Sequence, residues 1–167
     1  MIRIFLIASL IISNFTSAEY TNSNGKALEK PFKDLIKWVR SDVEPKLAQI
    51  DVSSEWQTIN LNESDNYIIW IGHSTFLIKK GGITILTDPV FSDRASPFKN
   101  VGPERLIPPA MSIDQLPKID FVTVSHNHYD HLDINSLKQI SKLHSEAIFF
   151  VPIGDGKLLK RKRIKNV

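Results

Sequence analysis

The stretch from Tyr67 to Asp88 carries three short runs of β-branched and aromatic residues, which constrain the fold more strongly than any other feature. The runs are YIIWI (Tyr67–Ile71), TFLIK (Thr75–Lys79) and ITILTD (Ile83–Asp88), separated by Gly72 and by the pair Gly81-Gly82. Side chains of this kind favour β-strands, and paired glycines favour tight hairpin turns. The stretch therefore predicts three strands that begin an antiparallel sheet.

A second group of elements follows a long loop. The segment from Pro89 to Pro117 is rich in proline and predicts irregular chain that crosses the surface or covers a site. KIDFVTVS (118–125) predicts a buried strand, Asp133 can cap a helix that extends to about Leu143, and AIFFVP (147–152) predicts another strand. Antiparallel strands followed by a strand–helix–strand unit indicate an α+β fold with helices packed on a face of the sheet.

Residues 1–18 have the pattern of an export signal. Arg3 provides a positive charge, residues 4–12 form an apolar stretch, and Thr16 and Ala18 are the small residues before the cleavage point. The apolar stretch is shorter than the ~20 residues that span a bilayer. We therefore expect an exported, periplasmic protein, and the alternatives are an uncleaved anchor or a buried first helix.

Residues 19–66 are expected to form a lead-in to a domain at 67–167. The lead-in is largely polar, and its segment 31–40 has apolar residues at helical spacing behind Pro31, which suits the first turn of a helix. The sequence therefore predicts one helix in the lead-in and places the sheet in residues 67–167.

Composition excludes several classes of protein. Of the 167 residues, 42% are hydrophobic and 23% charged, as in a globular chain. The absence of cysteine excludes disulfides and thiolate ligands, so any metal must be held by histidine and carboxylate. Six basic residues and no acidic one lie in 157–167, and the net charge is +3. This run could contact a membrane surface or be a solvated face, but it has no aromatic residue to stack a base, so we expect no nucleic-acid partner.

Three of the five histidines fall in the segment SHNHYDH, directly after the strand predicted at 118–125. His126 and His128 are two residues apart, so both point to the same side of an extended chain. Asp130 and His131 follow in the turn toward the predicted helix. Imidazole and carboxylate suit zinc, manganese or iron, and zinc is the first expectation for histidine with one carboxylate. The four residues are therefore the predicted metal ligands.

SHNHYDHLD, together with WIGHSTFLIKKGGITILTDPVFSDRASPF (Trp70–Phe98), resembles the metallo-β-lactamase superfamily. The second segment is similar to the branch of N-acylphosphatidylethanolamine phospholipases D and their bacterial relatives, including the lactonase-like UlaG type. The resemblance implies an αββα sandwich, with two sheets between outer helices, and two zinc ions at one edge. It also implies that His126 and His128 bind the first ion, and Asp130 and His131 the second.

The resemblance assigns further roles. Asp130 would be the catalytic residue that helps to orient the attacking water and passes a proton to the leaving group. Asp88 matches an early aspartate that orients ligands, and a strand-ending turn is the equal alternative. His73 also matches the family pattern, but from the residues alone we expect a hydrogen-bonded residue of a tight turn. His144, near the end of the predicted helix, is expected on the surface.

The implied reaction is metal-assisted hydrolysis of a phosphodiester in a lipid or another small molecule. The family takes further His and Asp ligands from later strand ends, whereas residues 153–167 contain no histidine and one carboxylate side chain, Asp155. We therefore expect the N-terminal half of the sandwich only, with apolar strand faces exposed and one zinc ion or none bound. A non-catalytic remnant or metal-binding fragment is the alternative to an active hydrolase, and the oligomeric state is not predicted.

Overall fold

The computed structural model describes residues 33, 53–98, 100 and 102–167. Apart from Lys33, which is helical, they belong to the second of two compact units, Gln49–Val167. The export signal predicted at 1–18 lies outside the described residues, as does most of the helix predicted at 31–40. Both therefore stay predictions.

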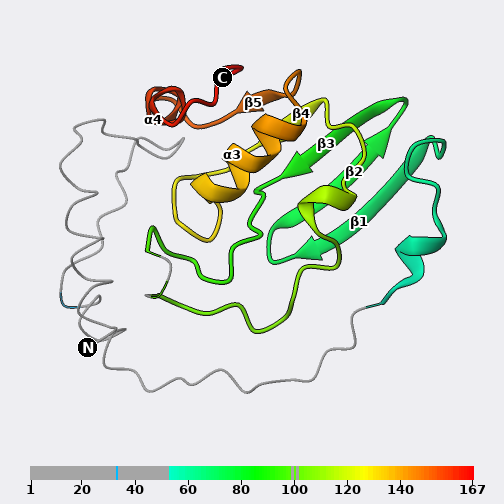
Figure 1. The fold of residues 1–167 in the computed structure, drawn as a ribbon, viewed down its shortest axis with the longest axis horizontal. Helices are drawn as coiled ribbons and strands as arrows, with labels where there is room; N and C mark the ends of the chain where they lie inside the picture. Colours follow the sequence, from blue (N-terminus) through cyan, green and yellow to red (C-terminus); the bar gives the residue numbers. More distant parts are fainter. Residues whose placement is uncertain (1–32, 34–52, 99, 101) are drawn as a thin grey trace. The chain divides into compact units, whose positions relative to one another are not determined.

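Five strands form one mixed sheet in the order β1-β2-β3-β4-β5 (Figure 1). The first three pair antiparallel, and β4 joins β3, and β5 joins β4, in parallel. The α+β class predicted from the sequence is thereby confirmed, although the last two strands are shorter than the runs that predicted them. The strands are β1 (Asn66–Gly72), β2 (Thr75–Lys80), β3 (Ile83–Thr87), β4 (Phe121–Thr123) and β5 (Ile148–Phe150).

The turn between β2 and β3 follows from its two glycines. Lys80 pairs with Ile83, which leaves Gly81 and Gly82 as a two-residue loop with φ angles of 56° and 80°. Positive φ at both central residues is the requirement of the tight hairpin turn whose twist matches that of the strands, and glycine meets it without steric cost. The predicted hairpin is confirmed.

The helix labelled α3 (Ile134–Leu143) lies over the face of the sheet that is turned to the viewer in Figure 1. Among the described residues from 53 onward, the α-helices are α3 and α4 (Asp155–Arg161), and the short 3-10 helices are η1 (Glu55–Thr58) and η2 (Ile113–Gln115). Asp133 caps α3 as predicted, because its carboxylate accepts hydrogen bonds from the backbone N–H groups of Asn135 and Ser136. In the described part of the chain, no helix is long and apolar enough to cross a bilayer.

One face of the sheet packs against α3 to form the core. Leu77, Leu86 and Val122 project from the three central strands, and Leu137 and Ile140 of α3 meet them in the same cluster of buried side chains, all 0% exposed. Burial of each large aliphatic side chain contributes about 1.5–3 kcal/mol. The core thus holds β3, β4 and α3 in a fixed relation, which positions the residues that directly follow β3 and β4.

The opposite face of the sheet is largely apolar, and none of the side chains in its cross-strand rows is fully buried. Two cross-strand rows run across it, one of Ile68, Ile78, Ile85, Phe121 and Ile148, and one of Trp70, Phe76, Thr87, Thr123 and Phe150. The outermost members remain in contact with solvent, with Ile68 71% and Phe150 55% exposed. The apolar strand face expected from the sequence is therefore present.

Candidate metal centre

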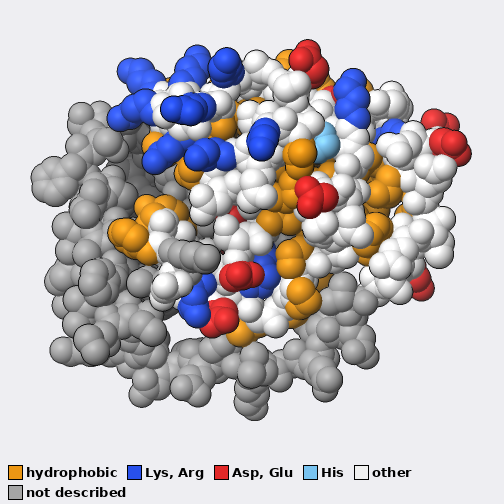
Figure 2. All heavy atoms as spheres, viewed as in Figure 1, with side chains coloured by type: hydrophobic (Ala, Val, Ile, Leu, Met, Phe, Trp, Pro, Cys, Tyr) orange, Lys and Arg blue, Asp and Glu red, His pale blue; other side chains and the backbone are white. Residues whose placement is uncertain are grey.

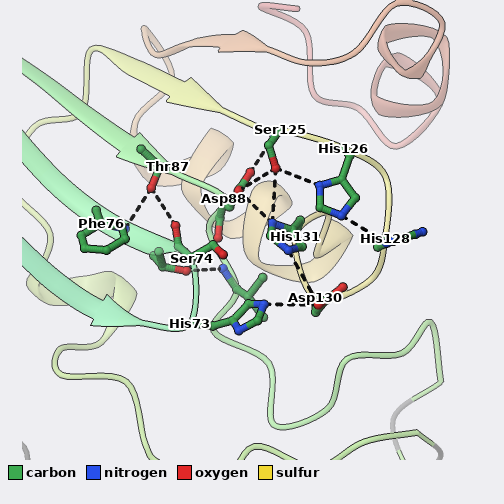
Figure 3. Close-up of polar contacts among 12 residues, drawn as sticks. His73, Ser74, Phe76, Thr87, Asp88, Ser125, His126, His128, Asp130 and His131 are labelled. Atoms are coloured by element: carbon green, nitrogen blue, oxygen red, sulfur yellow. Dashed lines mark hydrogen bonds and ion pairs between the residues drawn. The ribbon is translucent and has the colours of Figure 1, made fainter. Parts of the chain in front are cut away.

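The topology of the sheet brings three separate chain segments to one edge. β3 and β4 are parallel, so the residues that follow them emerge side by side. β2 is antiparallel to β3, so the turn between β1 and β2 lies at this same edge. His73 comes from that turn, Asp88 follows β3, and the segment 125–131 follows β4 (Figure 3).

The side chains at this edge form two groups with metal-ligand geometry. His126, His128 and Asp130 form one group, and His73, Asp130 and His131 form the other; within each group the candidate ligand atoms lie within 4.8 Å of one another. In the first group, Nε2 of His126 lies 3.1 Å from Nδ1 of His128. In the second, an Asp130 carboxylate oxygen lies 3.2 Å from Nε2 of His73 and 3.7 Å from Nε2 of His131. Asp130 is therefore the residue that the two groups share.

The four ligands predicted from the sequence converge, and a fifth residue joins them. The loop from His126 to His131 folds back as predicted, with the backbone N–H of His131 bonded to the carbonyl of His128 at 3.0 Å. His73 was expected to be only a turn residue, yet its imidazole faces Asp130. The signal that could have found it is the predicted antiparallel order, which places the turn after β1 beside the end of β3.

Asp88 is buried beneath the imidazoles and connects them to the sheet. Its carboxylate lies 2.8 Å from Nδ1 of His131 and accepts hydrogen bonds from the backbone N–H and the hydroxyl of Ser125, at 2.6 and 2.8 Å. Its φ angle of 35° is in the left-handed region, which aspartate tolerates better than most residues. These contacts favour the ligand-orienting role over that of a simple turn residue.

The electrostatics of the cluster favour a neutral imidazole at His126. Removal from water lowers the pKa of His126, and the neighbouring His131 and His128 lower it further, while Asp130 and Asp88 act in the opposite direction. A neutral imidazole keeps the lone pair that a metal ion needs. The donor set of four histidines and one shared carboxylate fits a borderline metal such as zinc, manganese or iron.

A cavity of about 280 Å³ opens beside the cluster, with His73 and Asp130 in its wall. Most of its lining is apolar and includes Trp70, Val90 and Ile107. Arg105 also lines it and braces the loop after β3, since its guanidinium donates hydrogen bonds to the backbone carbonyls of Val90 and Ser92. Burial lowers the pKa of Arg105, and the nearby carboxylates of Asp133 and Asp93 oppose that shift.

His144 does not take part in the cluster, and its predicted surface position is wrong. The residue follows α3 and is half-buried, and its Nε2 is buried without a hydrogen-bond partner in the described part of the chain. Burial lowers the pKa of this imidazole. The helical pattern placed His144 just past the last apolar residue, but it could not show that the chain turns inward there toward buried Ala147.

Comparison with known proteins agrees with the geometry. The model of the β-lactamase superfamily domain matches residues 67–167. N-acyl-phosphatidylethanolamine-hydrolyzing phospholipase D 1 of Caenorhabditis elegans is 44% identical over 103 residues, which are 62% of this chain and 29% of the relative. The mitochondrial phospholipase D of the same description from Saccharomyces cerevisiae is 42% identical over 88 residues, 53% of this chain and 18% of the relative.

A metal-dependent hydrolase of Caldivirga maquilingensis is 35% identical over 66 residues, which are 40% of this chain and 23% of the relative. The chain thus spans less than a third of the length of each of these three relatives. The family match nevertheless covers more than half of the chain and includes every residue of the candidate metal centre. The chain belongs to the metallo-β-lactamase superfamily.

Proposed function

We propose that this chain provides the metal-binding part of a hydrolase that cleaves a phosphodiester bond in a lipid such as an N-acylphosphatidylethanolamine. The observation that carries the proposal is the position of Asp130, whose carboxylate is shared by two groups of potential ligands. The names of two relatives, which describe phospholipases D that hydrolyse this lipid, support the choice of substrate.

The residues of the cluster would have separate roles in metal binding and proton transfer. His126 and His128 would hold one zinc ion, and His131 with His73 a second, with Asp130 between them. Bound zinc supplies a water molecule of lowered pKa and withdraws charge from the phosphoryl oxygen. The carboxylate of Asp130, whose side chain is 46% exposed, would accept a proton from the attacking water and deliver it to the oxygen of the leaving alcohol.

The neighbouring cavity supports a lipid substrate. Its wall combines His73 and Asp130 with apolar side chains such as Trp70, Val90 and Ile107. A lipid phosphodiester has an anionic group that must reach the metal ligands and apolar chains that gain free energy on leaving water. The cavity places both environments side by side.

A contact with a membrane surface belongs to the same proposal. Six basic residues lie on α4 and the residues after it, and Lys and Arg side chains gather there in Figure 2. None of the six forms an ion pair with another described residue, and Ile153 beside them is 87% exposed. Anionic lipid would attract this surface by roughly 1 kcal/mol per basic residue. Export to the periplasm, as the N-terminal pattern predicts, is part of the proposal too.

Hydrolysis is tested with the zinc-loaded protein and bis(p-nitrophenyl) phosphate, a phosphodiester that needs no membrane. We expect release of nitrophenolate that is lost in His128→Ala and kept in Tyr129→Phe, an adjacent exposed residue outside the ligand groups. Equal rates for wild type, His128→Ala and a buffer blank would favour the alternative, a non-catalytic metal-binding fragment.

Membrane contact is tested by sedimentation with vesicles of phosphatidylcholine alone or mixed with phosphatidylglycerol. We expect binding to the anionic vesicles only, weaker in high salt, and reduced at least tenfold in Lys160→Glu/Lys165→Glu. Lys80→Glu/Lys138→Glu has the same charge change outside the basic run and should bind as wild type. Equal loss in both variants would argue for net charge alone.

A further inference from the structure

We propose that Ser125 is a positioning residue of the metal centre, whose hydroxyl connects Asp88 to His126 and fixes which nitrogen of that imidazole carries the proton. The inference rests on the proposed metal site and concerns the chain's own hydrogen bonds. The geometry points to one carboxylate, that of Asp88, which orients a ligand in each of the two groups, His131 directly and His126 through Ser125 (Figure 3).

Ser125 is held firmly at the end of the strand. The residue before it, Val124, donates its backbone N–H to the carbonyl of Phe150, which extends the pairing of β4 with β5 by one residue. Ser125 itself donates its backbone N–H to one oxygen of Asp88 at 2.6 Å and its hydroxyl to the other at 2.8 Å. Two hydrogen bonds to one carboxylate leave the hydroxyl oxygen little freedom to move.

The number of available hydrogens then determines which nitrogen of each imidazole carries the proton. A serine hydroxyl has one hydrogen, and a carboxylate oxygen only accepts, so this hydrogen is directed to Asp88. The Ser125 oxygen can therefore only accept from Nδ1 of His126, which lies 3.0 Å away. Nδ1 of His131 lies 2.8 Å from the same Asp88 oxygen, so it must donate as well. Both histidines therefore carry their proton on Nδ1.

The consequence is that both Nε2 atoms face the ligand groups unprotonated; in the metal-free chain, the lone pair of His126 Nε2 accepts a hydrogen bond from Nδ1 of His128. Nε2 of His126 points to His128 at 3.1 Å, and Nε2 of His131 lies 3.7 Å from Asp130. The two histidines differ in the hydrogen bonds that hold Nδ1 of each ring. Nδ1 of His131 lies 2.8 Å from Asp88 and 3.3 Å from the Ser125 hydroxyl, so it keeps the shorter contact when the hydroxyl is lost. Ser125 is instead the one hydrogen-bond partner of His126 Nδ1 within the described residues. Loss of the Ser125 hydroxyl should therefore release His126 and leave His131 in place.

The experiment is ¹⁵N NMR of the imidazoles in the full, metal-free chain, at a pH where the rings are neutral. In the wild type, His126 and His131 should both show a protonated Nδ1. In Ser125→Ala, His126 should shift toward the Nε2-protonated form that a free imidazole prefers, while His131 should not change. Ser125→Thr keeps the hydroxyl and should restore the wild-type spectrum.

Zinc affinity, measured by competition with a chelator, provides the second readout. It should fall about 10- to 100-fold in Ser125→Ala, the range for loss of a hydrogen bond that supports a ligand, and recover in Ser125→Thr. Thr87→Val is the matched control, because the Thr87 hydroxyl bonds to the carbonyl of Ser74 and the N–H of Phe76 at the neighbouring strand end and touches no imidazole. This variant should keep the wild-type tautomers and zinc affinity.

The inference is overturned if wild-type His126 carries its proton on Nε2, a result that needs no variant to fold. An unchanged His126 signal and unchanged zinc affinity in Ser125→Ala overturn it equally. The tautomer is measured without substrate, so a chain that fails to cleave phosphodiesters would leave this inference intact. A chain that cleaves phosphodiesters but has His126 protonated on Nε2 would refute this inference and not the proposed function.

Discussion

Asp130 is the residue that both ligand groups of the candidate metal centre have in common. Its carboxylate lies 3.2 Å from His73 and is the acidic member of both ligand groups. His128 belongs to one group only. A substitution at Asp130 should therefore affect every ion that the centre binds, whereas a substitution at His128 should affect one.

Asp130→Asn is expected to weaken zinc binding at least about tenfold and to lower the bound zinc per chain more than His128→Ala does, because the amide cannot supply an anionic oxygen to two sites. Elemental analysis after dialysis measures the stoichiometry, and chelator competition measures the affinity. Tyr129→Phe controls for disturbance of the loop. Full zinc content in Asp130→Asn would show that the carboxylate is not shared.

His144 should make the metal-free protein sensitive to acid. Burial lowers its pKa in the folded chain, so below the ordinary value of 6.5 the unfolded chain binds more protons than the folded one. The stability this provides is present above pH 6.5 and is lost as the pH falls through the lowered pKa. The thermal midpoint of the wild type should drop between pH 7.5 and 5.5, and it should drop less in His144→Leu. Equal drops in the two proteins would exclude this group as the cause.

At the scale of elements, Asp133 connects the beginning of α3 to the loop after β3. One carboxylate oxygen caps the helix through the N–H groups of Asn135 and Ser136, at 3.0 and 3.3 Å. The other accepts from the hydroxyl of Ser136 at 2.6 Å and from the N–H of Ser92 at 3.0 Å. The cap therefore holds together two loops that border the metal centre.

Asp133→Ala should lower the free energy of unfolding by about 1–2 kcal/mol or more, since removal of a cap costs this much and the Ser92 contact is lost as well. Asp133→Asn keeps an oxygen for the cap and should lose less. Urea unfolding followed by circular dichroism measures both. A loss below about 0.5 kcal/mol in Asp133→Ala would mean that the buried carboxylate contributes little.

Features that depend on residues close together in the sequence could be predicted. The pair Gly81-Gly82 determines its own hairpin, Asp133 caps the helix directly after it, and the ligands from His126 to His131 lie in one loop. The contacts that no local pattern predicted join distant residues. His73 meets Asp130 across 57 positions, and Asp88 meets Ser125 across 37. These contacts depend on the parallel pairing of β3 with β4, which no local pattern determines.

For the whole molecule, the sheet has two unlike faces. Leu86 of β3 is 0% exposed and belongs to the core on one face, whereas the opposite face carries the exposed apolar side chains of Ile68 and Phe150. Truncation of a core leucine to alanine costs about 2–5 kcal/mol, because it removes contacts and leaves a cavity. A side chain already in contact with water has little such energy to lose.

Ile68→Lys/Phe150→Lys should therefore leave the melting midpoint and the far-ultraviolet circular dichroism close to those of the wild type, with a stability change within about 0.5 kcal/mol per site. It should also lower the fluorescence of a bound apolar dye such as anilinonaphthalene sulfonate, since the two charges interrupt the cross-strand rows at both edges of the sheet. Leu86→Ala, on the other face, serves as the contrast and should destabilise the fold without removing the dye site. A loss of several kcal/mol in the lysine variant, with unchanged dye binding, would show that these side chains are buried in solution and that the open face is covered.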